Sequence, residues 1–433
     1  MTSGMRIIVT GLIAHHRLLG GVAWDYLNVV LGLARLGHDV FYVEDSGQWP
    51  YNLDGGPTGR DWIARDCTPH VEYLAGLMSE YGFGERWAFR FPLTSQWYGL
   101  TDIRRAEVIR SADLLINVSG SLEDPGQYRA VRRLAYIDTD PVFTQIELTE
   151  GRTVRADLLR GRVAAHDVHW SVGERVMEAG FETGHRWRPM KHPIVLSEWE
   201  SASEPGTALT TIMNWTSYQP LQFRGATYGQ KDAEMIRFLD LPSRLRGKAT
   251  LEVAMARGPH HVRWETYAGS MPAEIQRLVA VGSVVTPAEL LGRAGWRVVD
   301  AMLACADSAK YRQYIQSSRG EWSVAKNGYV RGRAGWFSAR SACYLAAGRP
   351  VVVQDTGFSS LLPLGEGVLA FETVEEAVAA IEEVQGHYGK HSKAARDIAA
   401  EYFDSAKILT RVIEESTAHR DLVSRSADGG NGG

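Results

Sequence analysis

Apolar strand patterns alternate with helical patterns along this chain, and the alternation constrains its fold more than any other feature. The run "MRIIVTG" ends at Gly11, a helical pattern extends from about Val22 to Leu36, and the run "DVFYVED" follows. Short, β-branched and almost continuous apolar runs are typical of strands buried in a parallel sheet. The runs "ADLLINVSG" and "RRLAYIDTDP" repeat the pattern. The sequence therefore predicts an α/β fold with parallel strands.

A polar, turn-rich stretch at 197–206, "SEWESASEPG", interrupts the alternation and is the predicted linker. Strand patterns such as "ALTTIMNW", "ATLEVAMA" and "RPVVVQ" follow it, again between helical ones. A chain of 433 residues is too long for a single core. We therefore expect two Rossmann-like, doubly wound domains at 1–200 and 201–390, a helix at 391–420, and a glycine-rich tail at 421–433 that builds no core.

Composition narrows the class of protein. The hydrophobic share of 45% and the charged share of 23% are those of a globular protein, and the net charge of −4 gives no general attraction to nucleic acid or anionic membranes. The three cysteines, Cys67, Cys305 and Cys343, are far apart and predict neither a disulfide framework nor a zinc site. The first residues, "MTSGMRIIVTGLIA", lack a basic region and predict a strand rather than a signal peptide, and no apolar run is long enough to span a bilayer. We expect a cytoplasmic protein that binds no nucleic acid and has no integral membrane segment.

Three segments carry a resemblance to a known family. Gly20 and Gly21, followed by a helical pattern and "LARLGHDV", resemble the opening of GT-B glycosyltransferases. The stretch "ACYLAAGRPVVVQDTGFSS" with the later "EEAVAAI" resembles their donor-binding half, and "AARDIAAEYFDSAKILTRVIEE" resembles their closing helix, which crosses back to the first domain. The resemblance implies two domains that face each other across a cleft. It also implies that the second domain holds a nucleotide-sugar donor, that the first holds a small-molecule acceptor, and that no metal or other cofactor takes part.

The loop "AKNGYVRGRAGWFS" has residue types suited to the leaving diphosphate. Glycines permit close backbone approach, arginines supply positive charge, and Ser338 caps the start of the next helix, where the helix dipole favours anions. A solvated surface loop is the alternative interpretation. The glycines and arginines are Gly328, Gly332, Gly335, Arg331 and Arg333.

Other candidate donor contacts follow from the resemblance. Arg224 and Lys231 stand where many members of the family clamp the donor phosphates, although Lys231 is also consistent with the start of an exposed helix. The loop "QDTGFSS" follows the strand "RPVVV", where the family contacts the sugar, and a plain turn is its alternative. The predicted sugar contacts in that loop are Asp355, Thr356, Gly357 and Phe358.

Three further expectations concern the rim of the cleft. Gly20 and Gly21 are predicted to let the backbone approach a ligand from the first domain, facing Ser338 and Asp355 across the cleft. Trp215 and Trp336 are expected near the ligand because their loops are.

Many retaining members of the family carry two glutamates eight positions apart, and here Gly335 and Cys343 occupy those positions. The stereochemical outcome is therefore open, and so is the alternative of a catalytically silent binding protein.

Two residues are candidates for the base that deprotonates the acceptor. His16 lies beside His15 in the loop after the first strand, and histidine has a suitable pKa. Asp138 ends a strand in "YIDTDP". The triplet Asp138–Thr139–Asp140 also matches the D-x-D signature that binds a metal in the other glycosyltransferase fold, GT-A. A GT-A-like, metal-dependent transferase is therefore an alternative function.

Two other classes of enzyme are alternatives to a glycosyltransferase. A nucleotide-sugar epimerase on the same fold needs acidic groups around the sugar and no separate acceptor. A dinucleotide-dependent oxidoreductase requires G-x-G-x-x-G after the first strand, and "TGLIAHHRLLGG" lacks that spacing. The sequence therefore favours sugar transfer and keeps the epimerase as the alternative.

Overall fold

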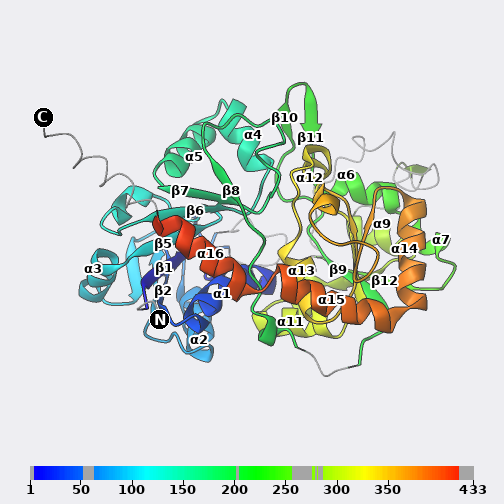
Figure 1. Cartoon of the computed structure of the whole chain (residues 1–433), viewed down its shortest axis with the longest axis horizontal. Coiled ribbons are helices and arrows are strands. Elements are labelled where there is room, and N and C mark those ends of the chain that lie inside the picture. Colours follow the sequence, from blue (N-terminus) through cyan, green and yellow to red (C-terminus); the bar gives the residue numbers. More distant parts are fainter. Residues whose placement is uncertain are drawn as a thin grey trace, which may run out of the picture.

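The computed structural model describes residues 4–51, 63–200, 204–255, 276–277, 280 and 286–418. The tail expected at 421–433 lies outside these residues. Figure 1 shows two lobes, each with a twisted sheet between helices. The two sheets are built from the segments before and after the polar stretch at 197–206. The exact limits assigned to the domains stay predictions.

The first lobe contains an eight-stranded sheet in the order β4-β3-β2-β1-β5-β6-β7-β8. All neighbouring strands are parallel except β3 and β4. The strands are Arg6–Thr10, Asp39–Glu44, Trp87–Phe91, Gln96–Gly99, Leu114–Val118, Leu134–Asp138, Val168–Ser171 and Trp187–Pro189 for β1 to β8. The helices are α1 (Gly20–Arg35), α2 (Thr68–Glu80), α3 (Asp102–Ser111), α4 (Phe143–Glu150) and α5 (Val154–Ala164), with short turns at Pro125–Tyr128 and Leu196–Glu198.

The second lobe contains a six-stranded parallel sheet in the order β13-β12-β9-β14-β15-β16. Its strands are β9 (Ala208–Ile212), β12 (Thr250–Met255), β13 (Arg297–Asp300), β14 (Gly320–Ser323), β15 (Val351–Gln354) and β16 (Val368–Phe371), beside a hairpin of β10 (Leu221–Phe223) and β11 (Ala226–Tyr228). The helices are α6 (Lys231–Met235), α7 (Leu241–Arg244), α9 (Pro287–Arg293), α10 (Ala301–Ala304), α11 (Ser308–Gln316), α12 (Asn327–Gly332), α13 (Ala339–Ala346), α14 (Val374–Gly386), α15 (Tyr388–Tyr402) and α16 (Ser405–Thr417), with short turns at Ile236–Phe238 and Phe358–Ser360.

Local sequence signals set the limits of these elements. All five residues of β5 and β6 are buried, as expected for strands covered on both faces. Thr373 caps α14 with its side chain, and Glu376 completes a capping box. Helix α1 ends at Arg35, and Gly37 follows with a left-handed φ of 87°.

Helix α16, red in Figure 1, packs on the first lobe although it ends the described chain. A Cβ added to Gly32 of α1 would lie 2.5 Å from Leu409 Cδ1 and 3.0 Å from Ser405 Cβ, so the two helices are in close contact. The backbone N–H of Ile194 donates to the carbonyl of Phe403, just before α16. Helix α16 and the residues just before it therefore connect the second lobe to the first.

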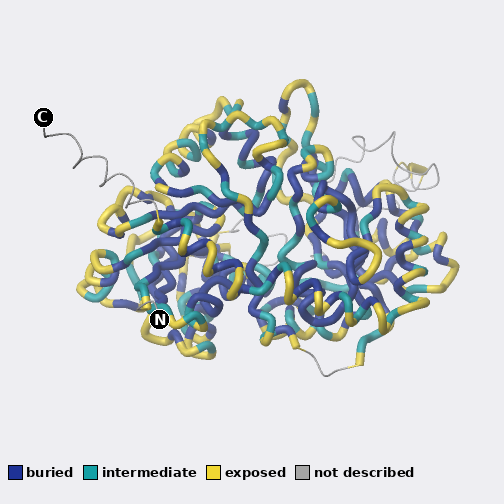
Figure 2. The backbone as a smooth tube through the Cα atoms, in the orientation of Figure 1, coloured by how far each residue is buried: buried dark blue, intermediate teal, exposed yellow. Residues whose placement is uncertain are grey.

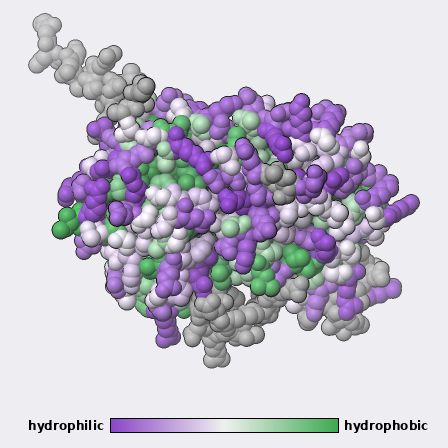
Figure 3. All heavy atoms as spheres, turned by 90° about the horizontal axis from the view of Figure 1, so that it is seen from below, coloured by the Kyte–Doolittle hydropathy of each residue, from purple (hydrophilic) through white to green (hydrophobic). Residues whose placement is uncertain are grey.

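The core is continuous across both lobes. One cluster of buried apolar side chains includes Leu27 of α1, Tyr311 of α11 and Tyr344 of α13. The buried parts of the tube in Figure 2 are mainly the strands and the helix faces that cover them. On the face in Figure 3, hydrophilic side chains predominate and apolar ones form separate groups. Among the described helices, none has an apolar stretch that could cross a bilayer.

Candidate functional site

A cavity of about 440 Å³ lies between the two lobes. The first lobe lines it with the start of α1 and with Thr139, which follows β6. The second lobe lines it with the segments after β9 and β14 and with the starts of α6 and α13. In open α/β sheets, ligands bind outside the carboxyl ends of the strands. The position and the volume both suit a ligand of nucleotide size.

Two helices present their N-terminal turns to this cavity. Helix α1 begins at Gly20 without a side-chain cap, and Gly20 and Gly21 both line the cavity. Helix α13 begins after Ser338, whose hydroxyl accepts a hydrogen bond from the Arg340 backbone N–H, and Ser338 and Ala339 line the cavity from the other side. Helix N-termini carry partial positive charge and attract phosphate groups.

Three cationic side chains line the same cavity: Lys231, Lys326 and Arg340. The Lys326 Nζ lies 3.0 Å from a carboxylate oxygen of Asp140, and the Arg340 Nε lies 2.7 Å from one of Glu321. In the described part of the chain, Lys231 forms no ion pair. Burial, together with the nearby Arg340 and Lys326 cations, lowers the pKa of Lys231 well below its ordinary value. A half-buried lysine that forms no ion pair and lines a cavity beside two helix N-termini is suited to a ligand with negative charge.

The cavity also contains two titratable groups that the sequence motifs did not single out, Asp25 and His192. Asp25 is exposed and lines the cavity. The protein around it partly excludes water from its carboxylate, which raises its pKa to about 7 against a smaller opposing effect of Arg340. Burial lowers the pKa of His192 to about 4, so its imidazole is neutral at pH 7. Asp25 is the one acidic residue in the apolar helix α1. That isolation is a signal by which the sequence could have identified it, but the predictions from the sequence did not use it.

Five of the predicted donor residues lie together around the cavity: Gly20, Gly21, Lys231, Trp336 and Ser338. Their positions agree with a shared site, and their roles stay predictions. Gly21 lines the cavity from the first lobe and Ser338 lines it from the second lobe, in agreement with the arrangement expected across the cleft. Asp355, the third member of that arrangement, does not line the cavity.

The glycines at 20 and 21 were predicted to let the backbone approach a ligand, and the structure gives a different reason for them. A Cβ on Gly20 would lie 2.1 Å from the carbonyl oxygen of Asp307, and one on Gly21 would lie 2.9 Å from the Tyr311 ring. The Cβ positions of both glycines therefore face the second lobe, although the two residues also line the cavity. Glycine therefore allows α1 to pack tightly against the segment that begins α11. The Gly20 backbone N–H also donates to the Cys305 carbonyl at 3.0 Å.

The glycines of the loop before α13 serve the same purpose. A Cβ on Gly328 would lie 2.4 Å from the Phe143 ring, and one on Gly332 would lie 2.5 Å from Val142. Val142 and Phe143 lie at the start of α4 in the first lobe. A Cβ on Gly335 would lie 2.8 Å from Leu361. The close approach predicted for a diphosphate is thus an approach between protein segments.

We expect Gly20→Ala to destabilise the protein by about 1–3 kcal/mol, because the new methyl group collides with backbone atoms that cannot turn aside. Urea denaturation followed by tryptophan fluorescence measures the change. The matched control is Gly161→Ala, in a helix where the added Cβ has open space, and it should stabilise the protein by about 0.4–1 kcal/mol. Equal stability of Gly20→Ala and the parent would contradict the packing role.

Arg333 and Asp355 lie outside the cavity and bind each other. The Arg333 guanidinium forms ion pairs with Asp355 and Glu372, at 2.8 and 2.9 Å. Asp355 also accepts hydrogen bonds from the backbone N–H groups of Gly357 and Ser359. The alternative interpretation of this loop, a turn organised by its aspartate, matches these contacts. Arg331, also predicted as a cation of the loop, donates to the Thr227 carbonyl.

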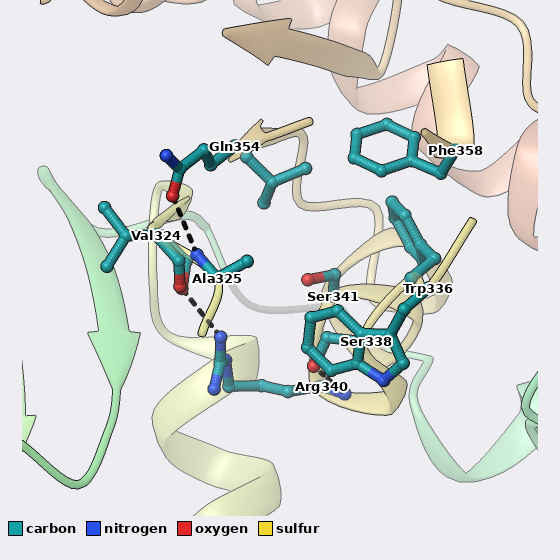
Figure 4. A pocket seen from close by; sticks show the side chains of 11 residues that line it. Val324, Ala325, Trp336, Ser338, Arg340, Ser341, Gln354 and Phe358 are labelled. Atoms are coloured by element: carbon teal, nitrogen blue, oxygen red, sulfur yellow. Dashed lines mark hydrogen bonds between the residues drawn. The ribbon is translucent and has the colours of Figure 1, made fainter. Parts of the chain in front are cut away.

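Thr356, Gly357 and Phe358 are likewise absent from the lining of the main cavity. The Thr356 hydroxyl donates to the Trp336 carbonyl, and a Cβ on Gly357 would lie 2.7 Å from the Arg333 carbonyl oxygen. Phe358 lines a neighbouring cavity of about 20 Å³, where Trp336, Ser338 and Arg340 lie together at the start of α13 (Figure 4). This loop supports the cavity wall and does not reach the main cavity.

Neither predicted base lines the cavity. Burial and, to a smaller extent, the neighbouring His15 lower the pKa of His16 to about 3, which makes its imidazole a weak base. The Asp138 carboxylate is buried and accepts hydrogen bonds from Gln145 and Ser171. The structure therefore corrects both positions. Thr139, the residue after Asp138, does line the cavity.

Asp138 and Asp140 of the D-x-D triplet have different partners. Asp140 pairs with Lys326 and accepts hydrogen bonds from Tyr218 and Tyr329, in contacts that cross between the lobes. Within the described residues, no group of three or more His, Cys, Asp or Glu side chains is arranged to hold a metal ion. Asp140, the last residue of the triplet, therefore acts in the structure as a contact between the lobes.

Arg224 and Trp215 are also displaced from the cavity. Arg224 lies in the turn of the β10–β11 hairpin with a left-handed φ of 49°, and its guanidinium lies over the Phe223 ring. Trp215 is fully buried in the core of the second lobe, next to the cavity residues Met213 and Asn214. Cys343, at the position of the second family glutamate, is buried, and burial raises its pKa well above the ordinary value.

Comparison with known proteins rests on structure alone. No model of a known protein family matches the chain, and no curated protein matches it. Solved structures do match along almost the whole length. HepE from Anabaena, in complex with UDP and glucose, matches with a TM-score of 0.52 and 11% identity over 96% of this chain and 100% of that chain. An α-glucosyltransferase in complex with UDP-glucose and DNA matches with a TM-score of 0.52 and 12% identity, over 96% of this chain and 99% of that chain.

A third match has the same extent. Sucrose-phosphate synthase from Thermosynechococcus elongatus gives a TM-score of 0.50 and 11% identity over 97% of this chain and 100% of that chain. These structures consist of two Rossmann-like domains, and both sheets of the present chain are included in the match. The chain has the GT-B fold. The resemblance drawn from the sequence is confirmed at the level of the fold. The GT-A-like fold of the alternative is wrong, because the chain divides between two sheets, as in the GT-B structures. The metal independence of the reaction stays a prediction.

Proposed function

We propose that this chain is a glycosyltransferase that moves a sugar from a nucleoside diphosphate sugar to a small-molecule acceptor without a metal ion. One observation carries the proposal. Two helix N-termini and the unpaired Lys231 meet in one cavity between the lobes. The structural matches support it, since HepE was solved with UDP-glucose and the α-glucosyltransferase with UDP-glucose and DNA.

The arrangement suits the leaving group of such a transfer. When the bond between the anomeric carbon and the diphosphate oxygen breaks, the electron pair stays on the diphosphate. Lys231, Arg340 and the α13 N-terminus stabilise that charge, and the protein fixes them before the reaction begins. Arg340 is held by Glu321, the Ile212 carbonyl and Ser323. Preorganised groups of this kind lower the barrier because they need no rearrangement.

Several polar residues that line the cavity are suited to binding the sugar and the acceptor. Thr139, Ser217 and Asn214 offer hydroxyl and amide groups there. Trp336 adds an aromatic surface, and its indole N–H has no partner in the described structure. Sugars bind through such combinations of hydrogen bonds and aromatic faces. These residues take the role predicted for the loop at 355–358, which lies outside the cavity.

Calorimetric titration with UDP, GDP, dTDP and their glucose derivatives tests the proposal. We expect at least one nucleotide to bind, with its sugar derivative competing for the same site, in the presence of EDTA as well as of Mg²⁺. Absence of binding across the panel overturns the proposed function. Incubation of the bound donor without any acceptor then tests the epimerase alternative, because an altered sugar would form from the donor alone.

A further inference from the structure

Asp25 is an unpaired carboxylate inside the cavity. It lies one helical turn after Gly21 on the same face of α1, and both residues line the cavity. In the described part of the chain, Asp25 forms no hydrogen bond or ion pair. Asp25 is exposed and lines the cavity, so an acid without a partner in an otherwise apolar helix is placed where a ligand can reach it.

The contacts of Asp25 place it on one side of the cavity. The next turn toward the N-terminus packs on Tyr311, and the carboxylate is near enough to Arg340 and Cys343 for their charges to interact. Lys231 interacts with Arg340, with Glu321 and, more weakly, with Lys326. Arg340 therefore stands between two sides of the cavity, with Asp25 on the α11 side and Lys326 on the other.

The two sides differ in chemistry. Ala301, Cys305 and Tyr311 line the Asp25 side and provide apolar and aromatic surface. The Lys326 side provides hydroxyl and amide groups from Thr139 and Ser217 and the amide of Gln230, whose Nε2 has no partner in the described structure. A diphosphate held at Arg340 and Lys231 would place a flat nucleobase against the apolar side and a sugar against the polar side. The ribose then lies beside Asp25.

We propose that Asp25 accepts hydrogen bonds from the ribose hydroxyl groups of the nucleotide, and that it makes the site selective for ribonucleotides over 2′-deoxyribonucleotides. The inference rests on the proposed nucleotide-sugar site. A carboxylate is the group that other nucleotide-binding folds use for ribose hydroxyls, because its two oxygens accept from a vicinal diol. Here the carboxylate comes from the first lobe while the phosphates bind mainly to the second, so ribose binding also links the two lobes.

The test compares UDP with 2′-deoxy-UDP, and GDP with 2′-deoxy-GDP, by calorimetric titration of the full chain and of Asp25→Asn. We expect the parent to bind the ribonucleotide about 10- to 100-fold more tightly than its deoxy counterpart, since a hydrogen bond to a charged group has about that effect. Asp25→Asn should reduce the ratio to about threefold or less, by weakening the ribonucleotide alone. The control Asp157→Asn removes an exposed acid of α5 and should leave the ratio unchanged.

The possible results separate the two proposals. A ratio that is the same in the parent and in Asp25→Asn overturns the role of Asp25 while nucleotide binding stands. The same holds if Asp25→Asn lowers kcat at saturating donor without a change in the ratio, because the carboxylate would then act on the acceptor. If the parent binds none of these four nucleotides and none of the wider panel that includes dTDP, the proposed function is overturned and this inference with it. Binding of dTDP alone would overturn the role of Asp25 while the proposed function stands.

Thermal unfolding shows whether the variant is folded. Because burial raises the pKa of Asp25 above its unfolded value, the native state keeps its proton up to about pH 7 and then carries an unfavourable charge. Asp25→Asn should therefore raise the Tm at pH 8 and leave it nearly unchanged at pH 4. A lower Tm at pH 8 would show that Asp25 has a structural partner and would overturn the proposal.

Discussion

Replacing Arg340 with Gln should destabilise the protein by about 3–5 kcal/mol, the cost of leaving a buried charge without its partner. The Glu321 side chain is fully buried at the centre of the second sheet, and one of its oxygens lies 2.7 Å from Arg340 Nε. The guanidinium also donates to the Ile212 carbonyl and to Ser323. Chemical denaturation followed by circular dichroism measures the loss.

The double variant Glu321→Gln/Arg340→Gln separates the two roles of this arginine. Removal of both charges should restore most of the stability, because no unpaired buried ion remains. Nucleotide binding should stay weak, since the cation that faces the diphosphate is still absent. A single Arg340→Gln variant as stable as the parent would show that Glu321 finds another partner. Recovery of full affinity in the double variant would show that Arg340 does not contact the ligand.

The sequence predicted the sheets well because their strands are defined locally. The run "MRIIVTG" contains β1, and "RPVVVQ" contains β15, each with a fully apolar centre. Strands covered on both faces require such runs wherever they occur in the chain. The start of α13 at Ser338 was predictable for the same reason, because an N-cap depends on residues adjacent in sequence.

The site was less predictable, because its geometry depends on residues far apart in the chain. Nothing near Gly20 indicates that Asp307 occupies the space next to it, and nothing near Arg333 indicates Asp355 and Glu372. A basic, glycine-rich loop has the same sequence whether it binds phosphate or another segment of protein. Asp25 and His192 fall outside any motif, and their environment in the folded chain distinguishes them.

The cavity concentrates charge that the fold does not neutralise. Lys231 and Asp25 lie in one cavity, yet each lacks an ionic partner in the described structure, while neighbouring charges such as Arg340 and Lys326 are paired. Selection for stability alone would replace both residues. Groups that cost stability and lie in a cleft are typical of binding and catalytic sites. These two residues therefore distinguish the ligand site from the ion pairs that join the lobes.

Lys231→Met is the variant that tests this argument most directly. The substitution should weaken UDP binding by about 10- to 100-fold, as expected for the loss of a charge-assisted hydrogen bond, and it should raise the Tm. The pKa of Lys231 lies well below its ordinary value of 10.5, so the native state binds fewer protons than the unfolded state and loses stability below that pH. The gain in Tm should therefore be present at pH 7 and shrink as the pH approaches 10.5.

The binding heat of the parent provides a second measurement at the same residue. A bound diphosphate favours the charged form of Lys231, so UDP binding should take up a proton, and the calorimetric heat should depend on the ionisation enthalpy of the buffer. That dependence should be absent in Lys231→Met. Lys248→Met is the matched control, because Lys248 is exposed and pairs with Glu382 away from the cleft. Should Lys231→Met bind UDP as tightly as the control, the phosphates must bind elsewhere, and the unpaired lysine would need another explanation.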